Sequence, residues 1–263
     1  MEPEIKNLPQ YSKIAKLASE KAGDFLMKNF RKHSPNAFSY KKHHEIVTTA
    51  DKRANEIIVK IIKTNFPNHN IVSEEAEYKK TKSPFCWYID PLDGTSNYTA
   101  GSPLFAVNIG LVHNNEIILG IINLPYMKEI YWTMKDHGAF CNGKRIHVSK
   151  TKNLKQSFIQ ICHAYRNRDR LIGTKIVARV TGRCRVYRGF GCAGVEHANV
   201  AAGRADASVI AGSRSWDNLA GALLIREAGG KVTDFKNKEW DVKSADFMAS
   251  NGKIHNQLLE TIK

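Results

Sequence analysis

The sequence predicts a mixed α/β fold, of α+β character, in which two halves share one interface. Apolar residues recur at helical spacing up to about residue 65, short apolar strands follow, and helix and strand patterns mix after about residue 150. No linker-like stretch interrupts the chain, so we expect an N-terminal half over 1–150 and a C-terminal half over 151–263. The cleft between them is the expected functional site.

The N-terminal half is expected to open with two amphipathic helices. The first covers roughly residues 8–30. The second begins at Thr48 or Thr49, whose hydroxyl can cap the first turn, and ends before Pro67. Its apolar face carries Ile57, Ile58, Ile61 and Ile62. We expect both helices to cover a sheet.

Strands are predicted to follow these helices. The apolar segments typical of strands are 70–73, 85–89, 104–112 and 116–122. Asn114-Asn115 joins the last two, and Asn142-Gly143 indicates a further hairpin. In the C-terminal half, the predicted elements are helices at 195–202, 218–228 and 255–262 and a strand at 231–233.

Composition limits the classes of function. The 263 residues are 42% hydrophobic and 25% charged, which excludes wholesale disorder. The longest apolar stretch, 117–124, is too short to span a bilayer and no secretion signal is visible, so we expect a cytoplasmic protein with no membrane partner. Five scattered cysteines without a C-x-x-C pair argue against disulfides or a zinc cage. A net charge of +15 favours anionic ligands, such as phosphate esters or nucleic acid.

Carboxylates gather where predicted elements begin and end. Glu74 and Glu75 close one apolar strand, Asp90 and Asp93 close the next, and Asp217 opens a helix. Carboxylates brought together repel each other unless protons or cations intervene. Because no His or Cys accompanies them at ligand spacing, the all-oxygen set favours Mg²⁺ or Mn²⁺. An ordinary turn explains each acid alone, but together they favour a metal centre.

A second feature follows directly on Asp93. Gly94 permits a close backbone approach, and the amides of Gly94, Thr95 and Ser96 can form an anion site if a helix starts there. A phosphate group would then lie beside the metal ions.

At these residues the chain resembles the inositol monophosphatase family, among the Mg²⁺-dependent, lithium-sensitive phosphatases that include fructose-1,6-bisphosphatases. Two segments carry most of the resemblance: WYIDPLDGTSNY at 87–98 and WDNLAGA through EAGG at 216–230. Further matches lie at 45–51, 73–75 and 200–206. The resemblance implies a layered αβαβα sandwich, a homodimer and a small phosphorylated substrate.

The resemblance also implies two or three Mg²⁺ ions per site. The ligands it implies are Glu74, Asp90, the Leu92 carbonyl, Thr95, Asp93 and Asp217. The first four would hold one ion, while Asp90, Asp93 and Asp217 would hold the second. Glu74 would contact a third, water-rich ion.

Catalytic and substrate-binding roles are implied in the same way. Asp51 would pair with Thr95 to orient or deprotonate the attacking water, with Glu74 beside them. Lys41, with Lys42 as the one-residue alternative, would lie near metal-bound waters, and Glu75 is a further candidate. The implied substrate contacts are Gly94, Thr95, Ser96, Ala193, Arg214 and Asp217.

The chain departs from the family at two positions. Glu45 stands where Asp is usual, and Ile210 stands where inositol-processing members carry a Glu that contacts substrate hydroxyls. Ile210 cannot make those hydrogen bonds, whereas Arg214 can meet a second anionic group. Three substrates therefore stay open: inositol-1-phosphate or a related polyol or sugar phosphate, a 3′-phosphoadenosine nucleotide, and fructose 1,6-bisphosphate.

A function of another class rests on a basic segment at 166–188. Its cations are Arg166, Arg168, Arg170, Lys175, Arg179, Arg183, Arg185 and Arg188. They form either a polyanion-binding surface or a solvated or subunit-interface face, and the two interpretations have similar weight. The alternative function is therefore binding of RNA or the transcription machinery on a phosphatase scaffold.

Overall fold

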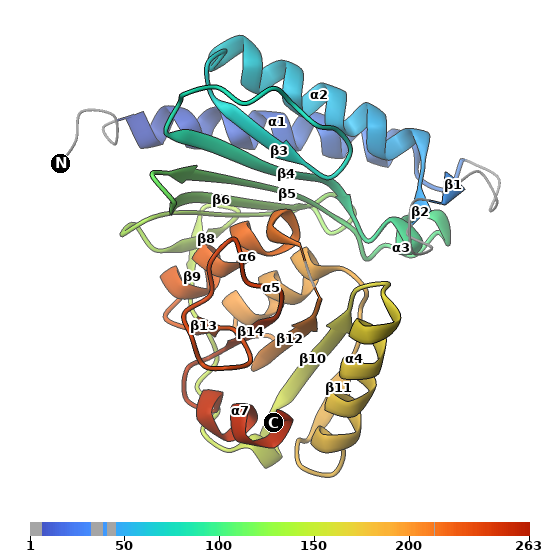
Figure 1. The fold of residues 1–263 in the computed structure, drawn as a ribbon, viewed down its shortest axis with the longest axis vertical. Helices are drawn as coiled ribbons and strands as arrows, with labels where there is room; N and C mark the ends of the chain where they lie inside the picture. Colours follow the sequence, from blue (N-terminus) through green and yellow to red (C-terminus); the bar gives the residue numbers. More distant parts are fainter. Residues whose placement is uncertain (1–6, 33–38, 41–45, 213) are drawn as a thin grey trace.

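The computed structural model describes residues 7–32, 39–40, 46–212 and 214–263, which form five layers of helices and sheets (Figure 1). The helices are α1 (Leu8–Asn29), α2 (Thr49–Asn65), α3 (Thr95–Thr99), α4 (Asn167–Val180), α5 (Ala193–Ala201), α6 (Ser215–Glu227) and α7 (His255–Ile262). Helices α1 and α2 cover a seven-stranded sheet, α5 and α6 lie between it and a five-stranded sheet, and α4 and α7 lie outside the second sheet. The predicted αβαβα layering is confirmed.

The two large sheets come from separate stretches of chain. The seven-stranded sheet runs in chain order through β3 (Asn70–Ser73), β4 (Phe85–Asp93), β5 (Ala106–His113), β6 (Glu116–Leu124), β7 (Glu129–Met134), β8 (Ala139–Cys141) and β9 (Lys144–Ile146). The second has the order β11 (Val186–Arg188), β10 (Phe158–His163), β12 (Ala207–Ala211), β14 (Phe247–Ser250) and β13 (Lys231–Thr233). A small pair, β1 (Ser39–Tyr40) and β2 (Ile46–Val47), precedes α2.

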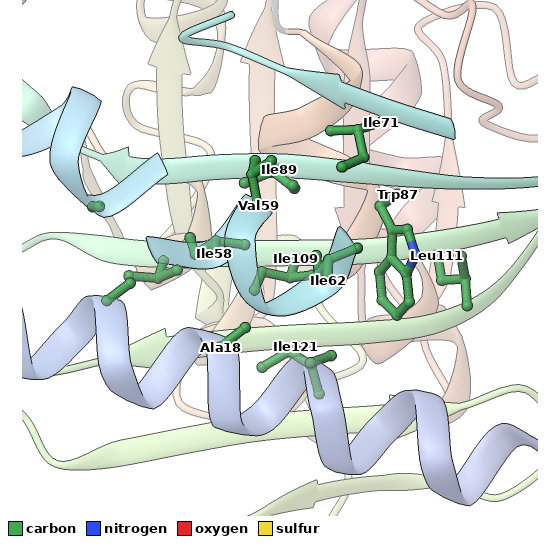
Figure 2. Packing of buried hydrophobic residues seen from close by; sticks show 14 of the residues in the cluster. Ala18, Ile58, Val59, Ile62, Ile71, Trp87, Ile89, Ile109, Leu111 and Ile121 are labelled. Carbon is green, nitrogen blue, oxygen red and sulfur yellow. The ribbon is translucent and has the colours of Figure 1, made fainter. Parts of the chain in front are cut away.

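The first two helices form for the reasons that the sequence indicates. Thr48 caps α2, since its hydroxyl oxygen accepts from the Ala50 amide and the Asp51 carboxylate accepts from the Thr48 amide. Ile58 and Ile62 are fully buried between α2 and the sheet, where they approach β4 and β5 (Figure 2). The predicted helices at 8–30 and after Thr48 are confirmed.

Both predicted hairpin turns are also confirmed. Asn114 and Asn115 have φ angles of 48° and 67°, and Asn142 and Gly143 have 47° and 78°. Two successive left-handed residues make the type I′ turn, whose twist matches that of the paired strands.

Some elements carry no distinct signal in the sequence. Helix α4 lies within the basic segment, where charges interrupt a narrow apolar face that buries Ile176 and Val180. Strands β12 and β14 are buried along their whole lengths, so they show no alternation of polar and apolar residues. Among the described residues, no helix has the length and apolarity needed to cross a membrane.

Helix α6 packs so closely on the seven-stranded sheet that two glycines of the sheet, in β5 and β6, have little room for a side chain. A Cβ at Gly120 in β6 would lie 2.7 Å from the carbonyl oxygen of Ala220 in α6 and 3.0 Å from its Cα. Because backbone cannot move aside as a side chain can, Gly120→Ala is expected to destabilise the fold by about 1–3 kcal/mol in urea unfolding. Gly110→Ala, whose methyl meets the movable end of Leu219, should cost less. Unchanged stability of Gly120→Ala would contradict this packing.

Candidate active site

Strand β4 ends in an irregular turn that carries two acids. Asp90 pairs with Asn108 and Asp93 with Ala106, and the register shifts between these pairs. The Leu92 amide, on the intervening turn, donates to Asp90 Oδ1 over 3.1 Å. Such an irregularity re-aims side chains, so the two carboxylates are freed from strict alternation across the strand.

Asp93 links strand β4 to helix α5 and strand β5. Its Oδ1 accepts from the Ala193 amide over 3.2 Å, and its Oδ2 accepts from the Gly194 amide over 2.6 Å and from Asn108 Nδ2 over 3.0 Å. Both amides belong to the first turn of α5, where helices have unsatisfied donors. The predicted substrate contact Ala193 therefore lies directly against Asp93.

The four predicted acids affect one another electrostatically. Burial raises the pKa of Asp90 well above its usual value, and the charges of Glu74, Asp93 and Asp217 raise it further. Asp217 is affected in the same way by burial, then by Asp93 and Glu74. The fold has therefore gathered acids from two strand ends and a helix start into one electrostatic cluster.

The oxygen atoms of the cluster are of the kind that Mg²⁺ and Mn²⁺ prefer. In the described part of the chain, no three His, Cys, Asp or Glu side chains form an ion cage by themselves. The Leu92 carbonyl oxygen lies 3.0 Å from Thr95 Oγ1, which matches the ~3 Å between adjacent ligands of an octahedral Mg²⁺ ion. A cation would also relieve the repulsion among the buried carboxylates.

Thr95 lies between the Leu92 carbonyl oxygen and a buried acid. Its hydroxyl is 2.9 Å from Asp51 Oδ1 and 3.0 Å from the Leu92 carbonyl oxygen, so one proton has two acceptors. Asp51 Oδ2 accepts from the Thr48 amide over 2.8 Å and from its hydroxyl over 2.6 Å. Burial raises the pKa of Asp51, and the hydrogen bonds from Thr48 and Thr95 oppose the rise. The Asp51–Thr95 pair is thus fixed in place.

The turn after Asp93 starts a helix, as expected. Gly94 has a left-handed φ of 81° and precedes α3, and a Cβ there would lie 2.8 Å from the Leu104 carbonyl oxygen. Glycine is required on both counts. Asn97 fastens the turn, since its Nδ2 donates to the carbonyl oxygens of Leu104 and Phe190 over 2.8 and 2.7 Å.

Asp217 reaches the cluster from the first turn of α6. Its Oδ2 accepts from the Arg214 amide over 3.0 Å, and the Arg214 charge opposes the rise of its pKa. Its neighbour Trp216 lines a groove of about 720 Å³ together with Glu74 and Glu75. Arg214 itself is exposed, and its charge acts on Asp217.

Position 210 is buried, and some predicted residues lie outside the described part of the chain. Ile210 is 4% exposed in β12, where it pairs with Cys162 and Phe247 within the apolar core. Lys41, with its alternative Lys42, and Glu45 lie outside the described residues.

Sequence reasoning missed three supporting residues. Asn108 donates to Asp93, and Asn97 donates to the Leu104 carbonyl oxygen next to the turn. The Tyr165 hydroxyl shares a hydrogen bond of 2.8 Å with Ser96 Oγ. Asn108 gives a signal in retrospect, because it is a polar residue within an apolar strand. Asn97 and Tyr165 act through contacts with distant segments, which local patterns do not reveal.

A buried acid near the site makes stability depend on pH. Glu196 in α5 is fully buried, accepts from the Phe190 amide over 3.0 Å and from Ser208 Oγ over 3.2 Å, and burial raises its pKa to about 8. Because this exceeds the usual value in an unfolded chain, its contribution to stability is greatest in acid and is lost as pH rises toward 8.

Glu196→Gln should therefore flatten the decrease in Tm between pH 6 and pH 8. The change removes a loss of up to about 1.4 kcal/mol per pH unit. Exposed Glu260→Gln on α7 is the control and should keep the wild-type slope. Equal slopes for all three proteins would show that Glu196 ionisation does not affect folding.

Comparisons with known proteins identify the family of this chain. Residues 7–263 match the inositol monophosphatase family. The chain is 35% identical over 260 residues to an Aquifex aeolicus fructose-1,6-bisphosphatase/inositol-1-monophosphatase, covering 98% of this chain and 97% of that protein. It is 31% identical over 252 residues to the Escherichia coli Nus factor SuhB, covering 95% and 94%. The Thermotoga maritima IMPase structure superposes with a TM-score of 0.86 at 34% identity, covering 93% of each chain. The chain therefore belongs to the inositol monophosphatase family.

Proposed function

We propose that this phosphomonoesterase hydrolyses a small phosphate ester of a polyol or sugar, such as inositol-1-phosphate, by attack of a water molecule. The observation that carries the proposal is the cluster of Asp90, Asp93 and Asp217 beside the hydrogen-bonded Asp51–Thr95 pair. The name of the Aquifex aeolicus relative, which joins fructose-1,6-bisphosphatase to inositol-1-monophosphatase, supports this class of substrate.

Family membership implies dependence on a divalent metal, and we assign the ligands as the resemblance does. Glu74, Asp90, the Leu92 carbonyl and Thr95 would hold one Mg²⁺ ion, Asp90, Asp93 and Asp217 a second, and Glu74 a third, with Mn²⁺ as a substitute. When bound, these ions would acidify the attacking water and neutralise charge on the phosphate oxygens.

The chain's own residues prepare the water and the phosphate. Asp51 accepts the Thr95 proton, which leaves a Thr95 lone pair to receive a hydrogen bond from the attacking water and so to orient it. The first-turn amides at Thr95 and Ser96 have no acceptor within their own helix, and they would bind phosphate oxygens. Substrate binding thus spans the end of β4 and the start of α3.

The leaving group would lie against the C-terminal half. Asp93 and Ala193 meet there, and Asp217 and Arg214 lie beside them. Buried Ile210 offers no partner for a substrate hydroxyl, whereas the exposed Arg214 suits a second anionic group. This keeps two alternative substrates, fructose 1,6-bisphosphate and a 3′-phosphoadenosine nucleotide.

A substrate panel tests the proposal. Phosphate release is measured with Mg²⁺ on inositol-1-phosphate, fructose 1,6-bisphosphate, 3′-phosphoadenosine 5′-phosphate and an aryl phosphate. We expect the polyol or sugar esters to give the highest kcat/KM. Preference for the nucleotide would replace the polyol assignment, and no release from any ester by the folded protein would contradict the proposed reaction.

A second candidate function rests on the outer face formed by α4 and β11. The cations of the basic segment at 166–188 are all exposed there. We propose that this face contacts RNA or the transcription machinery, as the name of the Escherichia coli relative suggests. The test is metal-independent RNA binding that weakens steeply with salt. Equal binding after Arg168→Gln and Lys175→Gln would contradict it. The homodimer and the cytoplasmic location stay predictions.

A further inference from the structure

A hydrogen bond joins the two halves of the molecule at the phosphate-binding turn. The Tyr165 hydroxyl, on the loop between β10 and α4, lies 2.8 Å from Ser96 Oγ in α3. Figure 1 shows this loop beside α3, although the two segments are distant in the sequence. Because Ser96 directly follows Thr95, Tyr165 is placed at the candidate active site rather than on a remote surface.

Tyr165 combines a hydrogen-bonded hydroxyl with an accessible side chain. Burial raises the Tyr165 pKa, the hydrogen bond with Ser96 opposes the rise, and the charges of Cys162, Glu74 and Asp93 add to it. The residue is 37% exposed, so a ligand can reach it.

The sheet topology explains why Tyr165 reaches this place. Strands β10 and β12 are parallel, with Cys162 paired to Ile210, and the Ala164 amide donates to the Ala211 carbonyl oxygen over 2.8 Å. The two strands therefore end at the same sheet edge, which is where α/β folds bind ligands. Tyr165 follows the end of β10, next to the end of β12. Ile210, which has no polar group, lies in that part of β12.

We propose that Tyr165 is a specificity-determining residue. When substrate binds, its hydroxyl gives up the hydrogen bond with Ser96 and makes one with a hydroxyl group of the ester's leaving group. The inference rests on the proposed phosphatase function. A phenolic hydroxyl both donates and accepts, which matches the hydroxyls of a polyol or sugar, and the ring covers an apolar C–H face. The site then favours hydroxylated leaving groups although a polar residue is lacking at position 210.

The test separates leaving-group recognition from phosphate binding. Tyr165→Phe removes the hydroxyl and keeps the ring. It should raise KM for inositol-1-phosphate about fivefold, the usual effect of one lost hydrogen bond, with kcat changed less than twofold. An aryl phosphate has no such hydroxyl, so its KM should change less than twofold.

Tyr187→Phe is the matched control, because Tyr187 is also 37% exposed but lies on β11. It should leave both KM values unchanged. Equal losses on both esters for Tyr165→Phe would show that Tyr165 binds the phosphate, and unchanged KM on both would show that it binds neither part; either result overturns the inference while the phosphatase function stands. Inactivity of the wild-type protein on every ester would instead overturn both.

Discussion

Asp217→Asn is expected to lower kcat by about a thousandfold or more without unfolding the protein. The substitution removes one negative charge from the implied second metal position, and losses of this size are usual when charge stabilisation of a transition state is removed. The fold should survive, because the Asn carbonyl oxygen can still accept from the Arg214 amide. The measurement is kcat at saturating substrate and Mg²⁺, with Tm recorded in parallel.

For the same variant we expect stability to be kept or increased, although activity is lost. Burial and the charges of Asp93 and Glu74 raise the pKa of Asp217, so a neutral amide relieves repulsion. In EDTA, we expect the Tm of Asp217→Asn to equal or exceed that of the wild type. Exposed Asp24→Asn on α1 is the control for both measurements. Near-normal kcat in Asp217→Asn would contradict its assignment as a ligand.

Asp51→Asn should lower kcat by about a hundredfold to ten-thousandfold, the usual range for loss of a general base or its partner. The carboxylate now accepts from Thr48 on one oxygen and from Thr95 on the other. An amide has only one accepting oxygen. It therefore either loses the hydrogen bonds from Thr48 that cap α2, or turns its N–H group toward Thr95. Steady-state kinetics with inositol-1-phosphate measure the effect.

Substitutions at Thr95 provide the matched comparison. Thr95→Ser keeps the hydroxyl and should retain activity within about tenfold, whereas Thr95→Val keeps the shape, removes the hydroxyl and should lose as much as Asp51→Asn. Wild-type kcat in Asp51→Asn or in Thr95→Val would remove the pair from the proposed mechanism.

The sequence predicts the parts of the site that depend on local chain geometry. Asp90, Asp93 and Gly94 lie within one turn, whose glycine and proline mark it even before the fold is known. The Thr48 cap is also a local signal, and it places Asp51 at the start of α2. In contrast, Tyr165 reaches Ser96 from 69 residues away, and no periodicity reports such a contact.

The fold is predictable to a similar extent. Strands β5 and β6 are found because the Asn114-Asn115 turn joins their two apolar runs. Strand β12 is equally buried, but no hairpin turn joins it to a neighbouring strand. Helix α4 is missed because basic residues dominate its surface, and only Ile176, Val180 and their neighbours form its packed face.

The measurement that tests the central claim most directly is phosphate release from inositol-1-phosphate by the wild-type chain in EDTA and after Mg²⁺ is restored. If the carboxylate cluster is a divalent-metal centre for ester hydrolysis, release should cease in EDTA and return with Mg²⁺, while Asp217→Asn stays inactive in both. Release that persists in EDTA at the wild-type rate would contradict the assignment of these acids to a metal centre.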